Sequence, residues 1–131
     1  MKIQPINLYI IDDNKLMVLD LKVYLKHKFG EHINITTFEN GESCLALIDK
    51  ETHVVILDYF MTGKNGIDIL KKIKTTNPKT EVIMLSTNEK MAVALEAFRA
   101  GAKDYVVKGV GYWKKIINLV KKEVSSLIAL S

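Results

Sequence analysis

The segment His53–Gly66 reads H-V-V-I-L-D-Y-F-M-T-G-K-N-G and decides the fold. Its apolar run, Val54–Leu57, shows no alternation and leads directly into Asp58. A run of this kind is typical of a strand that is buried on both faces, as in parallel sheets. The residues Thr62–Gly66 that follow are turn formers. Because open α/β sheets bind ligands beyond the carboxyl ends of their strands, Asp58 is a candidate site residue.

Strand and helix patterns alternate along the whole chain. We expect five strands, at Ile6–Ile11, Ile33–Phe38, His53–Asp58, Glu81–Ser86 and Lys103–Val107. We expect helices at Lys15–Phe29, Glu42–Lys50, from Asn65 or Gly66 to Asn77-Pro78, from Asn88 or Glu89 to Ala100, and at Tyr112–Leu130. Strands alternating with helices and joined by short loops predict one doubly wound α/β domain over residues 1–131, with a parallel sheet covered by helices on both faces.

Helix boundaries and buried faces follow from local signals. Asn14 is suited to cap the first helix, and Gly30 and Gly101 are suited to end the helices before them. Helical spacing in the fourth helix predicts that four of its apolar residues face the core, namely Met91, Ala94, Leu95 and Phe98.

Composition narrows the class of protein. The chain has 131 residues, 48% of them hydrophobic and 26% charged, which is typical of a globular domain. Its net charge of +4 comes from scattered lysines, so we expect no direct nucleic-acid binding. Cys44 is the single cysteine, and no apolar run approaches the ~20 residues that cross a membrane. We therefore expect a cytoplasmic protein with no membrane partner.

Polar residues stand at the ends of four predicted strands, and parallel pairing would bring them to one edge. They are Asp12-Asp13, Asp58, Ser86-Thr87 and Lys108. Three carboxylates in one cleft repel each other unless a cation lies between them, and hard oxygen ligands suit Mg²⁺ or Mn²⁺. A carboxylate, a metal site, a hydroxyl and an ammonium are the groups needed to transfer a phosphoryl group to an aspartate.

The chain resembles the receiver domains of two-component response regulators from about Ile6 to Leu130. Six features in order carry the likeness: Asp12-Asp13, Asp58, Gly66, Ser86-Thr87, the run Ala100–Tyr105, and Lys108. The resemblance implies a flavodoxin-like (βα)₅ fold with strand order 2-1-3-4-5. It also implies a signalling phospho-acceptor that assists its own phosphorylation and dephosphorylation, and no other enzymatic activity.

The resemblance also implies roles for single residues. Asp58 would accept the phosphoryl group, and Ser86 and Lys108 would contact its oxygens. The metal ligands would be Asp12, Asp13, Asp58 and the backbone carbonyl of Phe60. Ser86 and Tyr105 would form a switch, although Tyr105 also fits an ordinary edge-strand aromatic. Phe60, Thr87 and Asn88 would tune the reaction rates.

Gly109 departs from the family pattern, because a proline with a cis bond usually follows the lysine. A cis bond before a non-proline residue is costly, so we expect a trans bond between Lys108 and Gly109. The surplus apolar residues of the first helix, Leu16, Val18 and Leu19, fit either a docking surface for a phosphodonor or ordinary packing.

The resemblance implies partners on both sides of the signal. A histidine kinase or a histidine phosphotransfer protein would supply the phosphoryl group. The output would pass through the fourth helix, fifth strand and fifth helix to an effector domain or protein, and a homodimer through the fourth and fifth helices is a further expectation. The chain would be a stand-alone receiver or the N-terminal receiver of a longer, DNA-binding regulator.

Two other functions are compatible with parts of this pattern. A pseudo-receiver would bind a partner without being phosphorylated, and Gly109 and Thr87 keep that alternative open. A phosphatase of the haloacid-dehalogenase type needs a nucleophile and an acid two residues apart on the first strand, and Asp12-Asp13-Asn14 lacks that spacing.

Overall fold

A five-stranded parallel sheet forms the centre of the molecule, in the strand order β2-β1-β3-β6-β7. The computed structural model describes residues 4–61 and 64–130. The sheet strands are β1 (Ile6–Ile11), β2 (Ile33–Phe38), β3 (Thr52–Asp58), β6 (Glu81–Ser86) and β7 (Asp104–Val107). Counted along the chain this is the order 2-1-3-4-5, so the predicted flavodoxin-like topology is confirmed.

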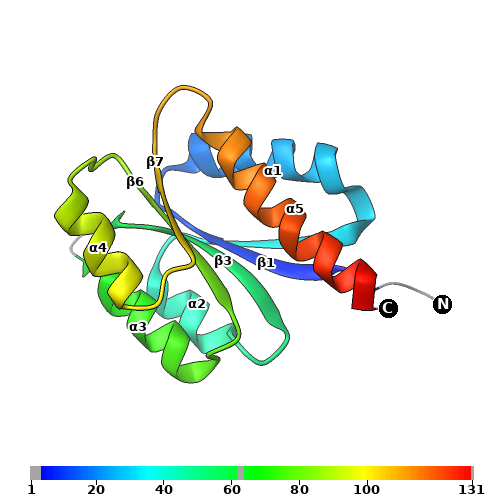
Figure 1. Cartoon of the computed structure of the whole chain (residues 1–131), viewed down its shortest axis with the longest axis horizontal. Coiled ribbons are helices and arrows are strands. Elements are labelled where there is room, and N and C mark those ends of the chain that lie inside the picture. The colour runs from blue at the N-terminus through cyan, green and yellow to red at the C-terminus, as the bar shows by residue number, and fades with distance from the viewer. Residues whose placement is uncertain (1–3, 62–63, 131) are drawn as a thin grey trace.

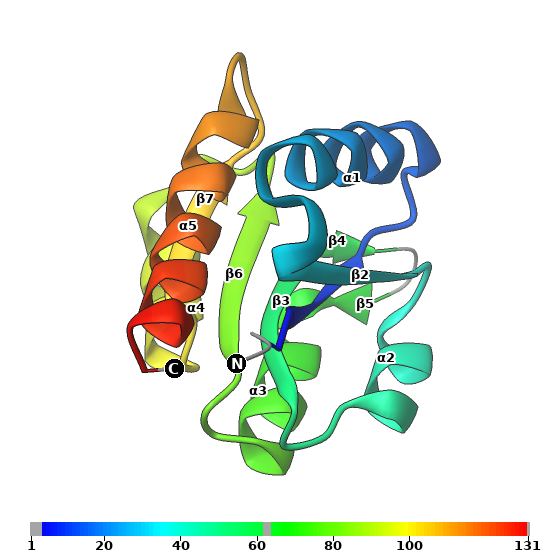
Figure 2. The same ribbon diagram turned by 90° about the vertical axis from the view of Figure 1, so that its right-hand side faces the viewer.

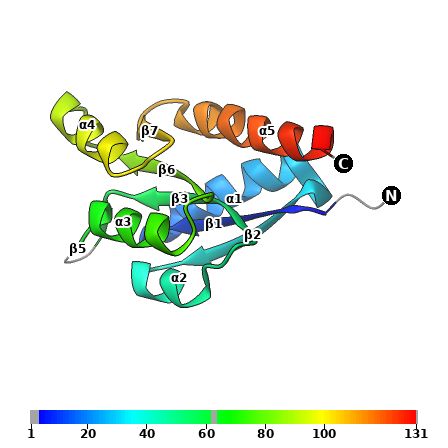
Figure 3. The same ribbon diagram turned by 60° about the horizontal axis from the view of Figure 1, so that its bottom comes forward.

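Helices cover both faces of the sheet (Figures 1 and 2). They are α1 (Lys15–Phe29), α2 (Gly41–Leu47), α3 (Gly66–Thr76), α4 (Met91–Arg99) and α5 (Tyr112–Leu130), with a 3₁₀ turn at Gly30–His32. The helices α1 and α5 lie side by side on one face, and α2 and α3 lie on the other (Figure 3). The predicted elements are therefore confirmed, with small differences in their bounds.

The sheet separates two apolar cores because successive side chains of each strand point to opposite faces. In β3, Val54 and Ile56 join the core under α1 and α5, whereas Val55 and Leu57 join the core under α2 and α3. All four side chains are buried. The uninterrupted apolar run of β3 thus reflects its place in the middle of the sheet, as the sequence predicted.

Local capping fixes the segments next to the sheet edge. The Asn14 side chain accepts a hydrogen bond of 3.2 Å from the Met17 N–H, which confirms the predicted cap of α1. Gly30 has φ of +55° and Gly101 has φ of +108°, so both helix ends use a backbone conformation that favours glycine.

The predicted buried face of α4 is wrong. Met91, Leu95 and Phe98 are 75%, 44% and 45% exposed, and Ala97 is the buried residue of this helix. Apolar residues occur on both faces of α4, and the face that carries Ala97 and Val93 packs against the core. The sequence pattern alone could not decide between these two faces.

Two helices are shorter than predicted because side chains and loops compete for their backbone groups. In α4, residues 88–90 form a loop, in which the Asn88 side chain accepts the Lys90 N–H at 2.9 Å. In α2, the helix ends at Leu47 and the Asp49 side chain accepts the Glu51 N–H at 2.8 Å. Such local side-chain bonds offer the backbone an alternative to the helix.

A two-stranded antiparallel ribbon, β4 (Phe60–Met61) with β5 (Lys64–Asn65), follows Asp58 and was not predicted. Thr62 and Gly63, which belong to the predicted turn, lie outside the described residues. The Gly66 N–H donates to the Tyr59 carbonyl at 2.7 Å, so the chain returns to the end of β3 before α3 begins. The ribbon thereby closes the segment directly after Asp58.

Replacing Gly66 by alanine is expected to destabilise the protein. A Cβ at this position would lie 2.6 Å from the Asp58 carbonyl oxygen, so the backbone beside Asp58 must shift. We expect Gly66→Ala to lower the free energy of unfolding by roughly 2 kcal/mol, measured by urea denaturation.

Gly109→Ala is the matched control, because a Cβ at Gly109 meets no neighbouring heavy atom within 4 Å. Equal stability of Gly66→Ala and Gly109→Ala would contradict the close approach at Gly66.

Candidate functional site

Three aspartates meet at the carboxyl edge of the sheet. Asp58 is the last residue of β3, and Asp12 and Asp13 follow β1 directly. Each offers a carboxylate oxygen, and these oxygens lie within 4.8 Å of one another. Asp12 and Asp58 are buried and Asp13 is exposed, so the cluster is open to solvent on one side. The structure therefore brings together the three predicted carboxylates, and this group could hold a metal ion.

Lys108 reaches this cluster from the end of β7. Its Nζ lies 3.3 Å from Asp12 Oδ2 and 3.1 Å from Asp58 Oδ1, and its side chain is only 18% exposed. The backbone N–H of Lys108 donates to the Ser86 carbonyl at 2.7 Å, which extends the pairing of β6 with β7. No cis peptide bond occurs among the described residues, so the trans bond expected between Lys108 and Gly109 is confirmed.

The Asp58 carboxyl is harder to ionise than an ordinary aspartate. Burial is the main cause, the nearby Asp12 carboxylate adds to it, and together they raise the pKa of Asp58 to about 6. The Lys108 ammonium and a hydrogen bond from the backbone of Phe60 act in the opposite direction. Asp58 is thus a carboxylate whose charge depends on the cations beside it, as is common at functional sites.

The Asp12 side chain is oriented by the start of α1. Its Oδ1 accepts the Asn14 N–H at 2.9 Å, and its other oxygen faces Lys108. Asp12 therefore takes part both in the turn before α1 and in the cluster.

Ser86 and Tyr105 are linked through the backbone of Asn88. Ser86 is buried, and its Oγ accepts the Asn88 N–H at 3.0 Å. The Tyr105 hydroxyl donates to the Asn88 carbonyl at 2.7 Å. Sequence reasoning named Ser86 and Tyr105 but missed the link, because it runs through main-chain atoms that carry no residue-specific signal.

The residues predicted to tune rates differ in their exposure, and the Phe60 backbone is hydrogen-bonded to Asp58. Phe60 is largely exposed, and its ring packs edge-on against Tyr59, with the ring centroids 4.7 Å apart. Thr87 is exposed and Asn88 is half-buried.

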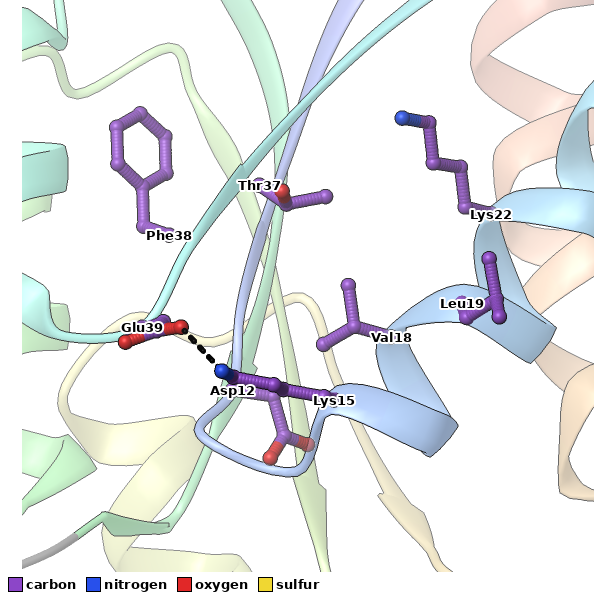
Figure 4. Close-up of a pocket in the computed structure, with 8 residues that line it drawn as sticks. All are labelled: Asp12, Lys15, Val18, Leu19, Lys22, Thr37, Phe38 and Glu39. Carbon is purple, nitrogen blue, oxygen red and sulfur yellow. Dashed lines mark ion pairs between the residues drawn. The ribbon is translucent and has the colours of Figure 1, made fainter.

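An open groove of about 340 Å³ lies beside Asp12, between α1 and β2 (Figure 4). Figure 4 shows Val18 and Leu19 on its α1 side, and an ion pair of 3.7 Å between Lys15 and Glu39. Leu16 and Leu19 are exposed, whereas Val18 is half-buried and packs against the core. The sequence left two interpretations of these three residues, a docking surface or ordinary packing. Ordinary packing applies to Val18 alone.

The parallel fold and the acidic cluster define a class of protein, the response regulator receivers. The family model for the response regulator receiver domain matches residues 8–121. The chain belongs to this family.

Relatives and solved structures agree with this membership. The chain is 31% identical over 99 residues to the chemotaxis protein CheY of Thermotoga maritima, covering 76% of this chain and 82% of CheY. It is 27% identical over 117 residues to TcrX of Mycobacterium tuberculosis, a probable transcriptional regulatory protein, covering 88% of this chain and 49% of TcrX. The chain therefore spans about half the length of TcrX.

Among solved structures, the response regulator DrrB of Thermotoga maritima superposes with a TM-score of 0.79 at 29% identity. The match covers 93% of this chain and 54% of DrrB. Within the described residues, no helix combines the length and apolar character needed to cross a membrane.

In buffer without divalent cations, Asp58 is expected to titrate near pH 6. Because its pKa in the folded state is raised above the ordinary value, folding favours protonated Asp58, and this contribution to stability is lost as the pH rises through about 6. We therefore expect Asp58→Asn to be more stable than wild type at pH 7, with a smaller difference near pH 4.

The titration can be followed by the ¹³C NMR shift of the Asp58 carboxyl carbon, and stability by thermal unfolding at each pH. A midpoint near pH 4, with no stabilisation by Asp58→Asn at pH 7, would contradict this assignment.

Proposed function

We propose that this domain accepts a phosphoryl group on Asp58 from a phosphohistidine of a histidine kinase or a histidine phosphotransfer protein. The observation that carries the proposal is the position of the Asp58 carboxylate, with Lys108 Nζ at 3.1 Å and two further carboxylates within 4.8 Å. Family membership supports the same chemistry.

In the proposed reaction, a carboxylate oxygen of Asp58 attacks the phosphorus atom and forms an O–P bond. The P–N bond to the donor imidazole breaks, and its electron pair stays on the nitrogen, which takes up a proton. Lys108 would pair with a phosphoryl oxygen, and the Ser86 hydroxyl would donate a hydrogen bond to another. Hydrolysis by water at phosphorus would restore the Asp58 carboxylate and end the signal.

The donor set fits a hard divalent cation. Three carboxylates and one ammonium leave two negative charges in the cluster, which a divalent ion would neutralise. Asp12, Asp13, Asp58 and the backbone carbonyl of Phe60 would hold Mg²⁺ or Mn²⁺. When bound, the ion offsets the charge that the phosphoryl oxygens bring to the site.

The bonded link from Ser86 through Asn88 to Tyr105 supports a role in relaying the signal. If the Ser86 hydroxyl turns towards a phosphoryl group, the Asn88 N–H loses its acceptor and the loop before α4 is free to move. Tyr105 would follow through its bond to the Asn88 carbonyl. The output would therefore pass through α4, β7 and α5.

The same proposal extends to partners and location. TcrX and DrrB are longer than this chain, so an effector domain or a separate effector protein is the expected target. We propose a cytoplasmic signalling module with no direct contact to nucleic acid, and a homodimer through α4 and α5 as one form of the phosphorylated state.

The function is tested by intact-mass spectrometry after incubation with acetyl phosphate. We expect an adduct on wild type that requires Mg²⁺ and is removed by hydroxylamine, and none on Asp58→Asn. Folded wild type that gains no adduct, either from acetyl phosphate or from phosphohistidine proteins, would overturn the proposal in favour of a pseudo-receiver.

The side chain of Phe60 is expected to influence hydrolysis of the phosphorylated form. Phe60 is large, apolar and exposed two residues after Asp58, so it affects how water reaches the acyl phosphate. We expect Phe60→Asn to change the autodephosphorylation rate by roughly threefold or more, a barrier change of about 0.7 kcal/mol. Equal half-lives of the phosphorylated wild type and variant would contradict this role.

The groove beside Asp12 is expected to contact the phosphodonor protein. Leu19 lines this groove, so Leu19→Glu should slow transfer from a histidine phosphotransfer protein by roughly tenfold, a loss of about 1.4 kcal/mol, and should spare the reaction with acetyl phosphate.

Leu47→Glu on α2 is the matched control, because Leu47 is 57% exposed and Leu19 is 56% exposed. Equal transfer rates for Leu19→Glu and Leu47→Glu would argue against docking at the groove.

A further inference from the structure

The segment after Lys108 has little packing of its own. A Cβ at Gly109 would meet no neighbouring heavy atom within 4 Å, Val110 is fully exposed, and Gly111 has φ of +74°. Figure 2 shows this loop between β7 and α5 projecting beyond the body of the molecule. Two glycines in three residues give the loop wide backbone freedom. The position of Lys108 therefore depends on what holds the two ends of the loop.

The end at β7 is held by the sheet, where the Lys108 N–H bonds to Ser86. The other end is the first turn of α5, and two aromatic residues fix it. Tyr112 is half-buried against the core under α1 and α5, and its N–H donates to the Gly109 carbonyl at 3.2 Å. Trp113 stacks on Tyr24 of α1, with ring centroids 4.4 Å apart and an interplanar angle of 7°.

This stack joins the two segments that supply the site. The helix α1 begins at Lys15, and the N–H of its N-cap residue Asn14 bonds to Asp12. The helix α5 begins four residues after Lys108. A stacked aromatic pair stabilises the contact beyond the effect of its buried area. Lys114 adds a cation over the Trp113 ring, with its Nζ 5.5 Å from the ring centroid.

We propose that the Tyr24–Trp113 stack is a clamp that positions Lys108 between Asp12 and Asp58. Tyr24 and Trp113 are positioning residues, since neither ring is among the groups that contact Asp12 or Asp58. This proposal depends on the proposed function, because the effect of the clamp is measured as the rate of phosphorylation of Asp58. With the rings separated, the glycine loop lets the Lys108 ammonium move away from the attacking oxygen and the phosphoryl group.

The test compares Trp113→Ala, Tyr24→Ala, the double variant and Trp113→Phe. The control is Phe98→Ala, since Phe98 is 45% exposed and Tyr24 is 40% exposed, and Phe98 lies on α4 away from the clamp. The initial rate of phosphorylation by acetyl phosphate is measured by intact mass across a range of Mg²⁺ concentrations. Amide hydrogen exchange is measured on the same proteins.

We expect Trp113→Ala and Tyr24→Ala each to lower the rate at saturating Mg²⁺ by roughly three- to tenfold, because small misplacements of a reacting group are costly. The double variant should be no slower than either single variant, and Trp113→Phe should retain most of the rate. The Mg²⁺ concentration for half-maximal rate should stay unchanged, because no proposed metal ligand belongs to the clamp.

Exchange should accelerate at the amides of Lys108, Tyr112 and Lys114 and stay slow in β3. If Trp113→Ala and Tyr24→Ala were phosphorylated at the same rate as Phe98→Ala, the proposed clamp would be overturned. The clamp would also be overturned if the variants needed more Mg²⁺ for half-maximal rate and the amides of β3 exchanged faster. That result would indicate a general loosening of the fold. Wild type that takes no phosphoryl group would overturn the proposed function, and the clamp with it.

Discussion

The structure depends on placing carboxylates of like charge in a largely buried cluster at one edge of a sheet. Asp12 and Asp58 are both buried, and Lys108 lies between them with contacts of 3.3 and 3.1 Å. Burying a charged group away from water costs free energy unless a group of opposite charge lies beside it. The Lys108 ammonium offsets part of this free-energy cost. The pKa of Asp58 is nevertheless raised, which means that burial and the Asp12 charge outweigh the effect of the ammonium. The cluster is therefore poised to take up further positive charge.

The fold explains why this arrangement can be rigid. The strands β1, β3 and β7 belong to one parallel sheet, so their carboxyl ends present Asp12, Asp58 and Lys108 on the same edge. Two apolar cores hold the central strand from both faces. Beyond these strand ends lie the β4–β5 ribbon, which follows Asp58, and the glycine-containing loop, which follows Lys108. The site residues thus lie at one edge of a packed scaffold, where the strands pass into their connections.

The sequence predicted features that local signals determine. The buried run before Asp58, the Asn14 cap and the turn at Gly101 each follow from a few neighbouring residues, and each is confirmed. The predicted orientation of α4 was wrong, because both faces of this helix carry apolar residues and only tertiary packing decides which face is buried. The β4–β5 ribbon was missed because strands of two residues leave no periodic pattern. The Tyr24–Trp113 stack joins residues far apart in the chain, which no local pattern can pair.

The central claim is that Asp58, among three clustered aspartates, receives the phosphoryl group. Borohydride reduces an aspartyl phosphate to homoserine, so reduction of the phosphorylated protein followed by peptide mass mapping locates the acceptor. We expect homoserine at position 58, and unmodified aspartate at positions 12 and 13. Homoserine at position 12 or 13, with Asp58 intact, would contradict the assignment of Asp58 as the acceptor and of Asp12 and Asp13 as metal ligands.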